Sequence, residues 1–175
     1  MMAEIETARL ILKPFQLDDF ADYHRQITSD SKVMQNLLPG KALSPKEAQL
    51  FFNRFLSHWE LHSFGVWILR DKENGDLIGQ CGLRWCYEYN PEIELVYAIA
   101  PSYWNKGFAT EAAKASLRYG FEQLTLDCIM AITAPTNYAS QKVMQKIGLK
   151  YQKNVDFYGK NCAYYLIYRH EWQAQ

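Results

Sequence analysis

Hydrophobic positions along the chain fall into short runs typical of strands and into spaced patterns typical of helices. The apolar runs predict strands over residues 10–14, 66–70, 77–85, 93–99, 128–134, 149–153 and 162–168. Apolar residues at helical spacing, with start and stop signals, predict helices over residues 18–28, 44–61, 109–124 and 139–147. Three of the strands follow one another without an intervening helix.

Turn residues separate these elements. Ser44-Pro-Lys-Glu47 is a capping box with proline at the first helical position. Asn74-Gly75 is the strongest hairpin signal in the chain, and Gly148 is placed as a helix C-terminal cap. These signals support the boundaries drawn from the hydrophobic pattern.

The order of elements predicts the α+β class. We expect a mixed, mostly antiparallel sheet of six to seven strands flanked by about four helices. No repeat, low-complexity tract or Pro/Gly-rich linker divides the sequence, so residues 1–175 are expected to form a single domain.

Composition narrows the class of protein. Hydrophobic residues make up 49% of the chain, enough for a substantial core. The 19 basic and 19 acidic residues balance, which gives no reason to expect a nucleic-acid or membrane partner. No signal peptide or transmembrane run is recognisable, and four scattered cysteines read as reduced, mostly buried thiols, so we expect a cytoplasmic protein.

The segment Tyr103-Trp-Asn-Lys-Gly-Phe-Ala-Thr-Glu-Ala112 joins a predicted strand to a predicted helix. Gly107 lets the backbone come close to a ligand, and the N–H groups of a first helical turn lack intrahelical partners. Such a turn suits a phosphate or pyrophosphate. The same residues also fit an ordinary strand-to-helix turn, because one glycine at a helix start is a weak signal.

A second segment bears on whether this turn binds a phosphate or is an ordinary strand-to-helix turn. It is Asn137-Tyr-Ala-Ser-Gln-Lys-Val-Met-Gln-Lys-Ile-Gly-Leu149. Together with Trp104-Asn-Lys-Gly-Phe-Ala109, it resembles the two central motifs of the Gcn5-related N-acetyltransferase (GNAT) superfamily. The resemblance is closest to the branch that includes ribosomal-protein N-terminal acetyltransferases. Trp104 stands where the superfamily usually has Gln or Arg, although Trp is common in this branch. Thr7-Ala-Arg-Leu-Ile-Leu-Lys-Pro14, Leu77-Ile-Gly-Gln-Cys-Gly82 and Arg169-His-Glu-Trp172 extend the resemblance over nearly the whole chain.

The resemblance implies a fold in which two central strands, here 93–99 and 129–134, splay apart around the pantetheine arm of acetyl-CoA. It implies that backbone amides near Gly107 hold the pyrophosphate, that Asn137 contacts the pantetheine, and that Ser140 lies near the sulfur. Many superfamily members carry a tyrosine acid further along this helix, but that position here is Met144. The cofactor-binding residues expected are Tyr97, Ala98, Ile99, Asn105, Lys106, Gly107, Phe108, Ala109, Thr110, Asn137 and Ser140.

Acetyl transfer to an amine needs a neutral amine, a donor for the oxyanion, and a proton or donor for the departing thiolate. The family often places a carboxylate on the first splayed strand, which makes Glu94 the expected base; a structural ion pair is the alternative. Backbone N–H groups from Tyr97 to Ile99 are candidate oxyanion donors, because splaying leaves that strand edge unpaired. Ser140 is the expected donor to the thiolate, with helix capping or a hydrogen bond back to the carbonyl of residue i−4 as its alternative role.

The acceptor side is expected where a strand passes into a loop rich in aromatic residues. Trp85, Tyr87 and Tyr89 are the expected substrate-binding residues there, unless they simply fill the core. His58-x-x-x-His62 has a spacing that can bind zinc, but Trp59 stands where a metal-site glutamate would follow, so no metal is expected.

Our interpretation is an acetyl-CoA-dependent N-acetyltransferase that acts by direct attack, without a covalent enzyme intermediate. The acceptor is either a protein N-terminal amine or a small-molecule amine, and the protein is a monomer or a homodimer. The alternative is a non-catalytic domain that binds acyl-CoA and would need neither Glu94 nor Ser140. A P-loop hydrolase is excluded, because the Gly-x-x-x-x-Gly-Lys-Ser/Thr pattern is absent from the sequence.

Overall fold

The computed structural model describes residues 3–87 and 92–173. Within these residues the chain builds one sheet of eight strands in the order β1-β2-β3-β4-β5-β6-β8-β7. All neighbouring strands are antiparallel except β5 and β6, which are parallel. The strands are β1 Ile5–Glu6, β2 Leu10–Pro14, β3 Val66–Asp71, β4 Leu77–Cys86, β5 Glu92–Ile99, β6 Cys128–Thr133, β7 Lys150–Phe157 and β8 Lys160–Tyr168.

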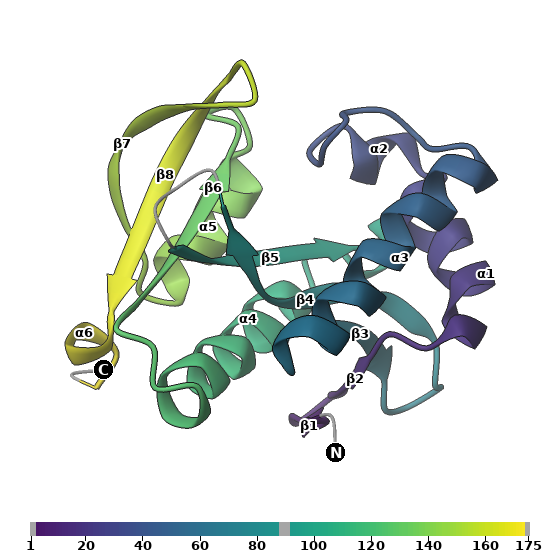
Figure 1. Ribbon diagram of the computed structural model, residues 1–175, viewed down its shortest axis with the longest axis horizontal. Helices are drawn as coiled ribbons and strands as arrows, with labels where there is room; N and C mark the ends of the chain where they lie inside the picture. The colour runs from purple at the N-terminus through teal and green to yellow at the C-terminus, as the bar shows by residue number, and fades with distance from the viewer. Residues whose placement is uncertain (1–2, 88–91, 174–175) are drawn as a thin grey trace.

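Helices lie on both faces of this sheet (Figure 1). The described α-helices are α1 Phe20–Tyr23, α2 Ser31–Met34, α3 Pro45–His62, α4 Phe108–Arg118, α5 Tyr138–Lys146 and α6 Arg169–Gln173. The predicted α+β class is therefore confirmed, with one strand more than expected and two short helices, α2 and α6, that the hydrophobic pattern did not predict. In the described part of the chain, no helix is both long and apolar enough to cross a membrane.

The helix ends follow the predicted signals. Ser44 caps α3, and the Glu47 side chain returns the bond to the Ser44 backbone, as in the predicted capping box. Asn137 caps α5 through its side chain, which accepts a hydrogen bond from the Ser140 N–H. Gly75 and Gly148 both have positive φ, as the predicted hairpin turn and helix cap require.

Two predicted helices continue past their α-helical part. The predicted helix over residues 18–28 is a 3-10 turn, the short α1 and a π-helical segment over His24–Thr28. The predicted helix over residues 109–124 is α4 followed by a π-helical segment over Tyr119–Gln123. The spacing of apolar residues does not distinguish these close helical variants.

Two hydrophobic cores hold the layers together. On one face, α4 and α5 pack on the sheet through buried residues such as Ala112, Leu117 and Met144. On the other face, α1 and α3 pack through an aromatic cluster that includes Phe15, Tyr23, Phe52 and Phe55. The sheet is thus covered by helices on both sides.

The sheet opens between β5 and β6. Their parallel pairing consists of one register pair in the described residues, Glu94 with Met130. Beyond this pair, β5 continues beside β4 as far as Ile99, while β6 continues beside β8 as far as Thr133. Figure 1 shows β6, β7 and β8 turning away from β5. The splayed strands expected from the sequence are these two.

Candidate active site

The diverging edge of β5 presents backbone groups toward the gap. An added Cβ at Gly79 on β4 would lie 2.2 Å from the Ala98 carbonyl oxygen, so the peptide groups of Ala98 face β4. Backbone groups of successive residues in a strand point to opposite edges. The N–H groups of Tyr97 and Ile99 are therefore directed toward β6, at the level where pairing with β6 has ended.

The loop after β5 follows a course that few residue types allow. Asn105 and Gly107 have φ of 61° and 82°, in the left-handed region. The Trp104 indole N–H donates to the Ile99 carbonyl at 2.6 Å, which ties the loop to the end of β5. The left-handed φ favours glycine at position 107, and its predicted role in letting the backbone come close to a ligand stays a prediction.

The first turn of α4 has the geometry of an anion site. Its N-cap is Gly107, which makes no side-chain hydrogen bond to the helix, whereas α2, α3 and α5 are capped by Asp30, Ser44 and Asn137. The N–H groups at this end, at Phe108, Ala109 and Thr110, have no acceptor within the helix. These donors and the helix dipole suit a phosphate, and the open backbone at Gly107 allows its close approach.

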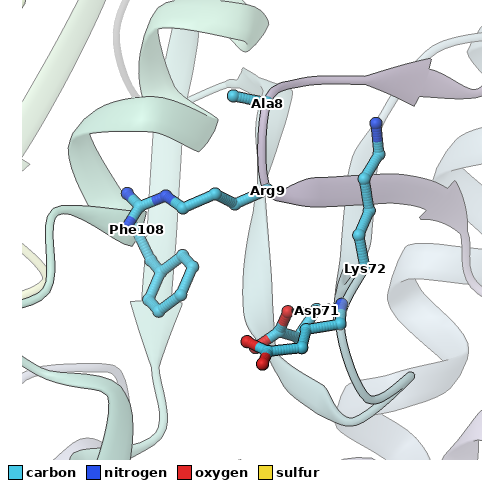
Figure 2. A pocket seen from close by; sticks show the side chains of 6 residues that line it. Ala8, Arg9, Asp71, Lys72 and Phe108 are labelled. Atoms are coloured by element: carbon cyan, nitrogen blue, oxygen red, sulfur yellow. Dashed lines mark hydrogen bonds between the residues drawn. The ribbon is translucent and has the colours of Figure 1, made fainter.

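Arg9, at the start of β2, braces this turn. It donates through Nη1 to the Lys106 carbonyl at 2.8 Å and through Nε to the Glu111 carboxylate at 2.7 Å. Its guanidinium carbon lies 4.3 Å from the centre of the Phe108 ring, and Figure 2 shows the side chain reaching across to that residue. Arg9 thus fixes the residues before and after Gly107.

Glu111 completes the brace. One of its oxygens accepts from the Thr7 hydroxyl at 2.6 Å and from the Arg9 backbone N–H at 2.8 Å. Burial of the side chain opposes ionisation, but the hydrogen bonds from Thr7 and Arg9 outweigh this and lower the pKa of Glu111. No pattern in the sequence predicts the contact between Arg9 and Glu111, since the two residues lie 102 positions apart in the chain.

A pocket of about 300 Å³ lies beside the brace (Figure 2). Its lining carries both signs of charge, so we assign it no ligand. The lining residues are Ala8, Arg9, Asp71, Lys72, Glu73 and Phe108.

Glu94 lies at the point where β5 and β6 separate. Its side chain is 4% exposed, and its carboxylate accepts from Arg84 at 2.6 and 2.7 Å. Arg84 and Glu94 are directly paired between β4 and β5, which places both side chains on the same face of the sheet. The ion pair considered from the sequence is therefore present, and the role of Glu94 as a base stays a prediction.

Ser140 lies in the first turn of α5 and contacts β5. Its hydroxyl is 2.8 Å from the Tyr97 phenol oxygen, and the phenol is also 3.0 Å from the Ser140 carbonyl oxygen. The helix is capped by Asn137 and not by Ser140, so the capping alternative for Ser140 does not describe this structure. Met144 is 2% exposed in the core, consistent with a packing role.

The predicted acceptor residues lie apart from Glu94. Trp85 and Tyr87 stack with ring centres 6.4 Å apart, and the Tyr87 hydroxyl is 3.0 Å from His62 Nε2. Trp85 is paired with Ile93, so it lies on the sheet face opposite Glu94. Tyr89 falls outside the described residues. The substrate-binding role of these aromatic residues stays a prediction.

Among the described residues, one further histidine is engaged in hydrogen bonds and three cysteines are hard to ionise. His58 is bonded to the Phe64 carbonyl at 2.9 Å through Nδ1, and its Nε2 accepts from the Trp85 N–H at 3.1 Å. Burial raises the pKa of the Cys81 thiol to about 12, and it also raises the pKa values of Cys128 and Cys162. These thiols are therefore poor nucleophiles at neutral pH.

The sequence of the chain is also similar to the sequences of known proteins. Residues 9–150 match a protein-family model described as an acetyltransferase (GNAT) domain. YnaD of Bacillus subtilis, named as an uncharacterized N-acetyltransferase, is 34% identical over an alignment of 180 residues that covers 96% of this chain and 98% of the relative. The N-acetyltransferase p20 of Bacillus licheniformis, likewise named as uncharacterized, is 31% identical and covers 85% of this chain and 83% of its own length.

Solved structures of other proteins have a similar fold. The GNAT-family acetyltransferase of Bacillus anthracis superposes with a TM-score of 0.81 at 27% identity, over 96% of this chain and 99% of the other. The spermidine N-acetyltransferase of Vibrio cholerae, solved with CoA and spermine, has a TM-score of 0.79 at 19% identity, over 95% of this chain and 99% of the other. At 19% identity, the similarity to the spermidine N-acetyltransferase is evidence for the fold alone.

Proposed function

The chain belongs to the GNAT family of acetyltransferases, and from this premise we propose that the gap between β5 and β6 is its active site. The chain is an acetyl-CoA-dependent N-acetyltransferase, as its family and its N-acetyltransferase relatives show. The observation that carries the assignment of the site is the loss of pairing after Glu94 and Met130, beside a helix that begins at a left-handed Gly107.

The phosphates of acetyl-CoA would bind at the start of α4. The donors are the backbone N–H groups from Asn105 to Thr110, held in place by Arg9, with the Lys106 side chain adding positive charge. From there the pantetheine arm would enter the gap toward Tyr97 and Ile99, with Asn137 as a further contact. This path brings the thioester to the level of Ser140.

Three groups would then carry the chemistry. Glu94 accepts a proton from the acceptor amine, directly or through a water molecule. The N–H groups of Tyr97 and Ile99 stabilise the oxyanion that forms on the acetyl carbonyl. The Ser140 hydroxyl donates a hydrogen bond to the sulfur as the C–S bond breaks. All three groups border the same gap, from β5 and α5.

The acceptor would reach the acetyl group from the face that carries Glu94. That face also carries Glu92, whose carboxylate accepts from the Tyr164 hydroxyl at 2.8 and 2.7 Å. A primary amine that is protonated in solution, either a protein N-terminus or a small molecule, would be drawn to this acidic face and lose its proton there.

The test is a panel of acceptors assayed by release of free CoA thiol. It contains peptides with free N-termini, the same peptides blocked at the N-terminus, and small polyamines. We expect turnover with at least one class of free amine and none with its blocked counterpart. Binding of acetyl-CoA without turnover on any amine would support the non-catalytic alternative.

A further inference from the structure

Tyr97 connects β5 to the helix that carries Ser140. Its phenol oxygen lies 2.8 Å from Ser140 Oγ and 3.0 Å from the carbonyl oxygen of the same residue. Further along this helix Met144 is buried and has no hydrogen to donate. A phenol is nevertheless present beside the start of α5, supplied by the strand that borders the gap.

We propose that Tyr97 is a positioning residue, which orients the Ser140 hydroxyl toward the departing sulfur of acetyl-CoA. The proposal rests on the role given to Ser140 above. The single phenolic hydrogen has two acceptors within reach, the Ser140 carbonyl and the Ser140 hydroxyl oxygen. When the phenol donates to Oγ, the hydroxyl hydrogen of Ser140 is free to point away from Tyr97. The sulfur of acetyl-CoA gains negative charge as the C–S bond breaks, and it then becomes the acceptor for that hydrogen.

The hydrogen bonds between Tyr97 and Ser140 have two possible arrangements, before and during the departure of the sulfur, which differ only in which oxygen donates its hydrogen. While the phenol donates to the carbonyl, Ser140 donates to the phenol; when sulfur becomes negative, the phenol donates to Ser140 and Ser140 donates to sulfur. In the transfer step the amine nitrogen bonds to the acetyl carbon, and the C–S bond breaks with its electron pair on sulfur. The nitrogen loses one proton to Glu94, the sulfur leaves as a thiolate that the Ser140 hydrogen bond stabilises and that takes its proton afterwards from solvent, and Ser140 and Tyr97 keep their own hydrogens throughout.

The surroundings of Tyr97 keep the phenol protonated. Burial raises its pKa, and the hydrogen bond with Ser140 only partly opposes this shift. The titratable groups that face it are Cys81 and Tyr165, and burial raises the pKa of Cys81 to about 12. With no charged side chain among these neighbours, the phenol remains a hydrogen-bond donor across the pH range of an assay.

The experiment is a double-mutant cycle with Tyr97→Phe and Ser140→Ala, measured as single-turnover acetyl transfer so that product release does not set the rate. We expect Y97F to slow transfer about tenfold, the effect of one hydrogen bond, with little change in the affinity for acetyl-CoA. The double variant should be no slower than S140A alone, because Tyr97 acts through Ser140.

Tyr165→Phe is the matched control. The Tyr165 phenol also bonds to α5, at Gln141 Oε1 over 2.9 Å, but it does not contact Ser140 in the described residues. Y165F therefore removes a comparable buried bond from the same helix. We expect its rate to stay within about twofold of the unmodified protein, as suits a bond that acts only on stability.

A second variant keeps the shape of the side chain. A ring-tetrafluorinated tyrosine at position 97 retains the ring and the oxygen while lowering the pKa of the phenol enough to offset the rise that burial causes. The transfer rate should then fall at alkaline pH, where the phenol loses its hydrogen, and should be unchanged at lower pH. A merely structural role for Tyr97 would leave the pH profile as it is with ordinary tyrosine.

The outcomes separate this inference from the proposed function. A slow S140A beside a normal Y97F, or additive losses in the double variant, would overturn the role of Tyr97 and leave Ser140 standing. A normal rate for S140A would remove the role of Ser140, and with it the inference. Slow transfer in both single variants without further loss in the double variant is the result we expect.

Discussion

Gly107 is the residue at which the smallest change tests the phosphate site. Its φ of 82° lies where a β-branched residue is strained by about 1–2 kcal/mol or more, and an added Cβ would lie 3.4 Å from Arg9 Nη2, the side chain that braces this turn. We predict that Gly107→Val weakens acetyl-CoA binding at least about tenfold in a calorimetric titration, because the phosphate can no longer approach the backbone.

Gly75→Val is the control for backbone strain. Gly75 has a similar φ of 78° in the turn between β3 and β4, and an added Cβ there meets nothing within 4 Å. Both variants should lose thermal stability, but only Gly107→Val should lose affinity. Equal affinity in the two variants would place the phosphates elsewhere.

Glu94 gives a prediction about pH. If it removes a proton from the acceptor, Glu94→Gln should lower the transfer rate most where the amine is protonated, and least at alkaline pH where the amine is already neutral. The measurement is the pH profile of kcat/KM for both forms. A loss of the same size at every pH would mean that Glu94 only pairs with Arg84.

Glu92→Gln is the matched control for that profile. Glu92 shares its side of β5 with Glu94, and its carboxylate is bonded to Tyr164. We expect a pH profile of the original shape, because this carboxylate is not at the point where the strands diverge.

At the scale of single residues, the sequence predicted the element on which a residue lies better than it predicted the residues that its side chain contacts. The motifs pointed to Gly107, Asn137 and Ser140; in the structure Gly107 begins α4, Asn137 caps α5 and Ser140 lies in the first turn of α5, while their binding and catalytic roles stay predictions. An ion pair of Glu94 was considered, but neither its partner Arg84 nor the contact of Tyr97 with Ser140 was predicted, because each depends on how separate elements are brought together. Strand alternation predicts the side of a residue, not its neighbour.

Among the elements, the junction of β2 with α4 is the one we expect to control cofactor affinity. Arg9→Gln removes the bonds to Lys106 and Glu111 without touching the N–H groups themselves. We predict an increase of about tenfold or more in the KM for acetyl-CoA and a smaller change in kcat, since the loop loses its fixed geometry before the ligand binds.

A comparison of acetyl-CoA with acetyl-pantetheine shows whether the loss of affinity in Arg9→Gln depends on the pyrophosphate. Acetyl-pantetheine lacks the pyrophosphate, so Arg9→Gln should leave its weaker reaction almost unchanged. Arg25→Gln, which breaks the exposed pair with Asp22, should behave like the unmodified protein with both donors. Equal losses with acetyl-CoA and acetyl-pantetheine would show that Arg9 supports the fold rather than the loop.

The elements themselves were largely predictable. Most strand boundaries fall within one or two residues of the hydrophobic runs, because a buried strand needs a continuous apolar stretch. The strand at β7 runs to Phe157, beyond the predicted end at residue 153, since its exposed residues carry no apolar signal. The two-residue β1 exists only through its pairing with β2, which no local pattern encodes.

For the whole molecule, the Arg9–Glu111 brace should contribute to stability in a pH-dependent way. The pKa of Glu111 is lowered in the folded state, so its contribution is fully present above the unfolded-state pKa of about 4.3 and is lost as the pH falls through the lower folded value. Glu47, with a pKa lowered to about 2, and Glu171 shift in the same direction.

Urea unfolding across this pH range tests that statement. We predict that Glu111→Gln is less stable than the unmodified protein at pH 6, and that the difference shrinks as the pH falls below about 4, where the glutamate becomes protonated. Glu122→Gln, an exposed change further along the chain, should show no such trend. A difference that stays constant with pH would mean that the charge of Glu111 contributes nothing.

The most direct test of the account is a calorimetric titration with acetyl-CoA beside adenosine 3′,5′-bisphosphate. The account predicts micromolar binding of acetyl-CoA and distinctly weaker binding of the bisphosphate, because the latter lacks the arm that enters the gap between β5 and β6. If the folded protein bound neither ligand, or bound both equally well, the assignment of that gap as the site of acetyl transfer would be contradicted.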